Sequence, residues 1–120
     1  MGMKMNKIAI TVILVGAFLI GVNANSRGCD IPTGLNASNI TGTSAVLSWA
    51  PVSGATGYHV SFQQINAGFW FSANTTDNSL TVGGYPVGLK RHTTYQFMLY
   101  AVCSDRTFST YSSLFSFRTL

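Results

Sequence analysis

Apolar and polar side chains alternate along most of the chain after residue 30. Ala45, Leu47 and Trp49 share one face of an extended segment, and the stretch from Tyr58 to Phe62 repeats the alternation. A period of two is typical of antiparallel strands that bury one face and expose the other. No stretch after the N-terminal segment keeps the spacing of an amphipathic helix. We therefore predict strands near residues 35–40, 44–49, 58–63, 69–73, 79–82, 94–103 and 114–119.

Turn residues separate these short segments. Pro51, Gly54 and Gly57, for example, are expected to form the turn between the second and third strands. Strands of this length and spacing predict an all-β fold, a seven-stranded antiparallel sandwich of two sheets packed face to face. Its core needs large inward side chains, and we expect Trp49 and Tyr95 to be among them.

The N-terminal segment has the order of a secretory signal. Lys4 and Lys7 precede an apolar run that ends at Val22, and Ala24 offers a small residue for cleavage. We expect a signal peptide at residues 1–24, a short lead-in at 25–31 and one domain at 32–120. A retained membrane anchor is one alternative, although the run is shorter than the roughly 20 residues that span a bilayer. A lipid-bearing Cys29 is another, although the expected upstream aliphatic residue is missing.

Export to an oxidising compartment favours a disulfide between Cys29 and Cys103, the only two cysteines of the chain. Closing a loop of this size stabilises a domain by on the order of 4 kcal/mol. A zinc site is not expected, because two sulfurs without further clustered ligands do not complete a tetrahedral set.

A set of landmark residues lies in one order along the chain. The most specific is the stretch from Leu89 to Phe97, which places leucine, threonine, Tyr95 and phenylalanine at a defined spacing. The others are Pro32, Leu35, residues 44–49, residues 57–60 and residues 111–119. Together they resemble a fibronectin type III domain over essentially all of residues 29–120. Arg91 stands where that family commonly has proline, which we expect to loosen one turn.

The resemblance implies an immunoglobulin-like sandwich with several residues in defined roles. The hydroxyl of Tyr95 would bond to the backbone upstream of it, as in a tyrosine corner. Cys29, before the first strand, would lie beside Cys103 at the end of the sixth strand, as in domains of secreted bacterial proteins. The expected structural core consists of Trp49, Tyr58, Leu89, Tyr95 and Phe97.

The composition argues against catalytic activity and against binding of nucleic acid. The net charge is +4, but two of the seven cationic residues belong to the expected signal peptide and the others are scattered. Catalysis needs a base beside a nucleophile, paired carboxylates or clustered metal ligands. The candidate groups are isolated from one another: His59, His92, Asp30, Asp77 and Asp105. We expect no enzyme activity, no cofactor and no metal.

A binding surface is expected on the outer face of the sixth strand. Met98 and Tyr100 face outward there if Tyr95 and Phe97 face inward. If Phe69 and Phe71 also point inward, Trp70 shares the outer face, with His59 between. The candidate patch is therefore Trp70, Met98, Tyr100 and His59, with aromatic residues of the kind favoured at interfaces. Cross-strand packing alone is the alternative explanation for these side chains.

The sequence therefore predicts a monomeric, non-catalytic interaction module that is secreted or at the cell surface, with a periplasmic location also open. Its partner would be a protein or a glycan, bound through an outer sheet face or loops. No membrane span is expected after signal cleavage. The alternative is a spacer or accessory domain of a larger secreted hydrolase, a protease or a glycosidase, with no ligand of its own.

Overall fold

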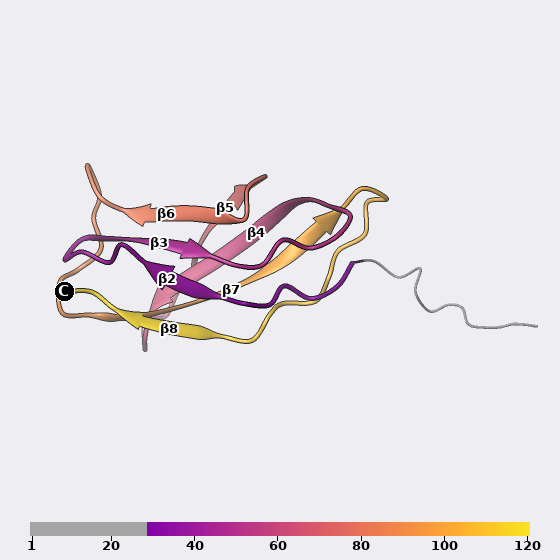
Figure 1. The fold of residues 1–120 in the computed structure, drawn as a ribbon. Helices are drawn as coiled ribbons and strands as arrows, with labels where there is room; N and C mark the ends of the chain where they lie inside the picture. The colour runs from indigo at the N-terminus through magenta and orange to yellow at the C-terminus, as the bar shows by residue number, and fades with distance from the viewer. Residues whose placement is uncertain (1–28) are drawn as a thin grey trace, which may run out of the picture.

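Two antiparallel sheets form the fold in the computed structural model, which describes residues 29–120 (Figure 1). The three-stranded sheet has the order β2-β3-β6, with β2 (Asn36–Ser38), β3 (Ser44–Ser48) and β6 (Ser79–Gly83). The four-stranded sheet has the order β5-β4-β7-β8, with β5 (Phe71–Thr75), β4 (Ala55–Gln64), β7 (Thr94–Cys103) and β8 (Phe115–Arg118). The described residues thus confirm the predicted all-β sandwich. The expected signal peptide lies outside them.

The core lies between the two sheets because the apolar side chains at every second position of each strand point inward. In β7 every second residue from Tyr95 to Cys103 is buried. The largest fully buried side chains are Phe97, Leu47, Leu99 and Val60. Of the expected core residues, Trp49, Tyr58, Tyr95 and Phe97 are buried, and Leu89 is half-buried against the same cluster.

Two buried tyrosines hold loops at opposite ends of the sandwich through their hydroxyl oxygens. Tyr95 Oη accepts a hydrogen bond from the backbone N–H of Lys90 at 2.9 Å, as the family resemblance implies. Tyr58 Oη accepts one from the backbone N–H of Val52, also at 2.9 Å. Each hydroxyl pairs a loop N–H that the sheets leave without a strand partner, which keeps a polar backbone group satisfied near the core.

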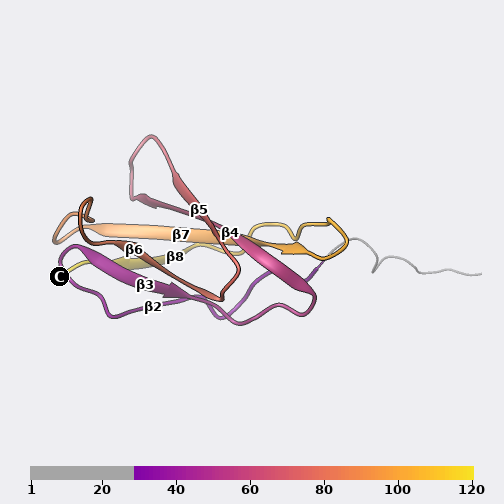
Figure 2. The same ribbon diagram turned by 90° about the horizontal axis from the view of Figure 1, so that it is seen from above.

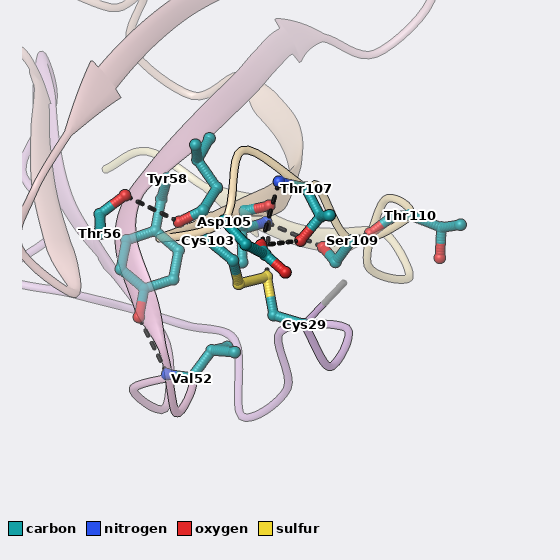
Figure 3. Close-up of a disulfide and its surroundings, with 11 residues drawn as sticks. Cys29, Val52, Thr56, Tyr58, Cys103, Asp105, Thr107, Ser109 and Thr110 are labelled. Atoms are coloured by element: carbon teal, nitrogen blue, oxygen red, sulfur yellow. Dashed lines mark hydrogen bonds between the residues drawn. A yellow bond between two sulfur atoms is a disulfide. The ribbon is translucent and has the colours of Figure 1, made fainter. Parts of the chain in front are cut away.

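A disulfide joins Cys29 to Cys103, with Cα atoms 6.1 Å apart (Figure 3). It ties the segment before β2 to the end of β7, at the pole where the chain enters the sandwich. Cys103 is buried and Cys29 packs against the core cluster. The bond therefore closes this end of the interior.

One local expectation is wrong. Gly57 is not in a turn: it lies inside β4, where the register with β7 shifts between Ala55 and Gly57 in the manner of a β-bulge. Phe71 pairs with Phe62 and so lies on the inner face of the four-stranded sheet, yet Phe69 and Phe71 are 59% and 51% exposed. In Figure 2 the hairpin of β4 and β5 stands away from the three-stranded sheet, which accounts for this exposure.

Candidate binding surface

Four aromatic rings, with that of Tyr100 at their centre, gather on the outer face of the four-stranded sheet. His59 of β4 and Tyr100 of β7 are cross-strand partners, and their rings stack with centroids 5.0 Å apart and planes 22° apart. The Tyr100 ring also makes edge contacts with Phe108 and Tyr111, at centroid distances of 5.7 and 5.1 Å. We call His59, Tyr100, Phe108 and Tyr111 the aromatic row.

Phe108 and Tyr111 reach the row because residues 104–114, between β7 and β8, run alongside β7. The backbone N–H groups of Ser109 and Ser112 donate to the carbonyls of Ala101 and Leu99, at 2.9 and 2.8 Å. Their hydroxyls in turn accept from the N–H groups of the same two β7 residues, at 2.8 and 3.1 Å. The serine hydroxyls thus accept the β7 hydrogen bonds that backbone carbonyls would accept in a regular strand pair, and they hold residues 104–114 against β7.

A short turn begins this segment (Figure 3). The Asp105 carboxylate accepts hydrogen bonds from the hydroxyl and the backbone N–H of Thr107. The side-chain bond from Thr107 is the main cause that lowers the pKa of Asp105 below its usual value, and the backbone bond adds to it. The carboxylate form therefore holds the turn that leads into Phe108.

Polar groups flank the row. On the β5 side, His59 Nδ1 lies 2.8 Å from Oδ1 of Asn74, its cross-strand partner in β5. Beneath the row, the hydroxyls of Ser61 and Tyr111 are 3.4 Å apart. Phe108 and Tyr111 are 59% and 42% exposed, whereas His59 and Tyr100 are half-buried. The result is an aromatic surface bordered by uncharged hydrogen-bonding groups.

The structure places the four predicted patch residues in different surroundings. His59 and Tyr100 stack in the row, and Met98 is half-buried beside Tyr100 on β7, opposite Ser61. Trp70 precedes β5 and is 40% exposed, and among residues 29–120 no ring contact joins it to Tyr100. The β4–β5 ladder runs from the Tyr58–Thr75 pair, through His59–Asn74, to Phe62–Phe71. Trp70 lies beyond that end, so it is at least about 10 Å along the strand from His59.

A second apolar surface follows from the position of the β4–β5 hairpin. The rings of Phe62 and Phe71 stack at 5.4 Å, and Phe69 meets Phe71 edge-on at 5.1 Å. With Val87 and Leu89 of the β6–β7 loop they line a groove of about 420 Å³. We call this the edge groove. Nothing in the described residues covers it.

Within residues 29–120 no three His, Cys, Asp or Glu side chains gather as metal ligands. His92 lies in a turn with φ of +53°. The described part of the chain also contains no helix long and apolar enough to cross a membrane.

The comparison with protein families identifies the class. The model of the fibronectin type III domain matches residues 30–115, and the chain belongs to this family. Domains of this family are generally non-catalytic modules. Among curated proteins, Exochitinase 1 of Streptomyces olivaceoviridis is 62% identical over 29 residues, which are 24% of this chain and 5% of that protein. The chain therefore matches only a small part of that relative.

Solved structures share the architecture. A structure described as a myokine superposes with a TM-score of 0.67 at 21% identity, covering 77% of this chain and 98% of its own. The FN5 domain of Drosophila Lar gives a TM-score of 0.59 at 23% identity, covering 77% and 97%. A redesigned β-sandwich protein gives 0.60 at 26% identity, covering 76% and 97%. These likenesses concern the fold.

Proposed function

We propose that this chain is a secreted, non-catalytic module that binds a neutral polysaccharide through the aromatic row. The observation that carries the proposal is the stacking of His59 on Tyr100, extended by the exposed rings of Phe108 and Tyr111. Aromatic side chains offer large, rigid contact area with little conformational entropy to lose on binding. Several such rings gathered on one sheet face suit an extended ligand better than a single small molecule.

The polar surroundings favour sugar over an apolar protein surface. The groups beside the rings are the amide of the exposed Asn74 and the hydroxyl of Tyr111, while the Ser61 hydroxyl lies buried beneath them. The faces of pyranose rings carry C–H groups that pack on aromatic rings, while their hydroxyls need hydrogen-bonding partners at the edge. The edge groove is also lined in part by polar residues, Gln64 and Lys90, so the choice of the aromatic row rests on its cluster of four rings.

A second candidate function is supported by the short match to the exochitinase. That relative is named for action on chitin, and the matched stretch is a small part of it. The same module would then be an accessory domain of a larger secreted hydrolase. The two candidates agree if the row holds polysaccharide near a catalytic domain, and they differ if the module only separates other domains.

Binding of the purified protein to insoluble polysaccharides and to their soluble oligomers tests the proposal. Tyr100→Ala and Tyr111→Ala should each weaken binding by about tenfold or more, as expected for aromatic contacts in a binding centre. Phe69→Ala, which removes an exposed ring of the edge groove, is the matched control and should leave affinity unchanged. The unfolding midpoint of each variant is measured alongside.

Two results would count against the proposal. If the row variants lose stability but keep wild-type affinity, the rings serve cross-strand packing and not recognition. If the protein binds no polysaccharide, the spacer function remains and the row is not a glycan surface.

A further inference from the structure

A hollow lies immediately beside the aromatic row. On the outer face, the Gly57–Val102 pair is the neighbour of the His59–Tyr100 pair along β4 and β7. Since Gly57 has no side chain, the surface sinks there into an open hollow of about 550 Å³. Its lining consists of Thr56, Gly57, Tyr58, Asn74, Thr75, Thr76 and Val102.

The bulge and the glycine together explain why the hollow exists. The register shift between Ala55 and Gly57 sits opposite Val102 and Cys103 of β7. A Cβ at Gly57 would come within 3.3 Å of the carbonyl oxygen of Thr75, so a larger side chain would fill the space between β4 and β5. The backbone of Gly57 does not require glycine, because its φ is not in the left-handed region. The open space is thus the feature that glycine provides.

The lining combines one free amide donor with hydroxyls and an apolar side. When His59 Nδ1 donates to Asn74 Oδ1, the two N–H bonds of the Asn74 amide remain available to a ligand. The Thr56 hydroxyl donates to the carbonyl of Val102 at 3.2 Å, which leaves its oxygen lone pairs to accept a further hydrogen bond. The side chain of Val102 supplies methyl groups.

This set of groups matches an acetamido substituent, which has a carbonyl acceptor, an N–H donor and a methyl group. We propose that the hollow receives the acetamido group of a sugar that stacks on the aromatic row, with the Asn74 amide donating to its carbonyl oxygen and Val102 contacting its methyl. This inference rests on the proposed glycan binding, and it gives the surface a preference for 2-acetamido sugars over unsubstituted ones.

The test compares the affinities of two soluble ligands of equal length and linkage, the β-1,4 tetramers of N-acetylglucosamine and of glucose. The wild-type protein should bind the acetamido tetramer about tenfold more tightly, the effect of one good hydrogen bond in free-energy terms. Asn74→Asp keeps an oxygen for His59 but removes the donor, and Gly57→Val fills the hollow. Gly57→Val should abolish the preference while leaving the affinity for the glucose tetramer within twofold. Asn74 also borders the aromatic row, so Asn74→Asp should weaken the binding of both tetramers, and that of the acetamido tetramer by the larger factor.

Control variants and outcomes keep the inference separate from the proposed function. Asn36→Ala removes an exposed asparagine on β2, in the other sheet, and should change neither affinity. If both tetramers bind equally, and Tyr100→Ala weakens both, the hollow has no role and the glycan surface stands. If neither tetramer binds, the proposed function itself is wrong. Loss of the preference in Asn36→Ala would also contradict the inference.

Discussion

Removing the hydroxyl of Tyr95 tests how the loops are held at the ends of the sandwich. Tyr95→Phe keeps the buried ring, which stacks on Phe117 with centroids 5.8 Å apart, but deletes the acceptor for the N–H of Lys90. A donor that loses its only protein partner in a part-buried position costs about 1–2 kcal/mol. For a domain of this size that lowers the unfolding midpoint by on the order of 5–15 °C.

Tyr58→Phe makes the equivalent change at the opposite end, where Tyr58 Oη accepts from Val52. Gln64 of β4 pairs with Tyr95 and lies six residues beyond Tyr58, so the two tyrosines are about 20 Å apart along the strand. Sites at this distance should act independently. The double variant should therefore lose the sum of the two free energies, about 2–4 kcal/mol.

Chemical denaturation followed by circular dichroism measures all three variants. A lost hydrogen bond is expected to change the free energy of unfolding by more than about 0.5 kcal/mol. A single variant whose free energy of unfolding differs from that of the wild type by less would show that water replaces the hydroxyl and that the loops do not depend on it. A double variant that departs from additivity would show that the two ends are coupled.

Three further predictions concern the stability of the fold. Replacing Cys29 and Cys103 together by alanine should lower the free energy of unfolding by about 4 kcal/mol, because the bond closes a loop with a sequence separation of 74; denaturation curves that coincide with those of the wild type would contradict this. Gly83→Ala should be strongly destabilising, since Gly83 has φ of +79° and an added Cβ would overlap the carbonyl oxygen of Thr43. Gly84→Ala should cost less, because Gly84 has φ of +87° but open space around it, so only backbone strain is added. Equal unfolding midpoints for the two variants would refute the steric argument. The turn at Asp105 should loosen as the pH falls below 3.8, the usual pKa of this carboxyl, and through its lower pKa in the folded domain. A pKa that is lowered in the folded state gives stabilisation that is present above the unfolded pKa and is lost below the folded pKa. The amide signal of Thr107 should therefore titrate in the wild type and not in Asp105→Asn.

Much of the fold could be predicted because the physical signal is local and repeated. The alternation in residues 94–103 matches β7 residue for residue, since burial on one face requires a period of two. The pattern from Leu89 to Tyr95 likewise predicted that the Tyr95 hydroxyl bonds to backbone upstream, and the structure identifies the donor as the N–H of Lys90. These features depend on neighbours in sequence.

The parts that sequence reasoning missed depend on contacts between distant segments. Gly57 reads as a turn residue, yet in β4 it leaves a hollow beside the row, and only the pairing with Val102 shows this. Phe108 and Tyr111 lie in a segment without strand periodicity, where serine hydroxyls fix the path. The one available signal was two aromatic residues in a stretch otherwise rich in serine and threonine.

The candidate patch also changed shape for a structural reason. If Phe69 and Phe71 point inward, alternation places Trp70 on the same outer face as Tyr100, but alternation does not fix how far apart two residues lie along the sheet. Trp70 lies beyond the Phe62–Phe71 end of the β4–β5 ladder, out of ring contact with Tyr100. The hairpin of β4 and β5 also stands away from the three-stranded sheet, which exposes both phenylalanines at the edge groove. The domain therefore has two aromatic surfaces, the aromatic row and the edge groove, which are built from different residues and can be tested separately.

Mapping of backbone amide shifts by nuclear magnetic resonance, during titration with a soluble β-1,4-linked N-acetylglucosamine tetramer, tests the central claim most directly. The account predicts that the shifts concentrate on residues 57–61, 74–76, 100–102 and 107–112, which carry the aromatic row and the hollow. Shifts confined to residues 62–71 and 83–90 around the edge groove, or no shifts at saturating ligand, would contradict it.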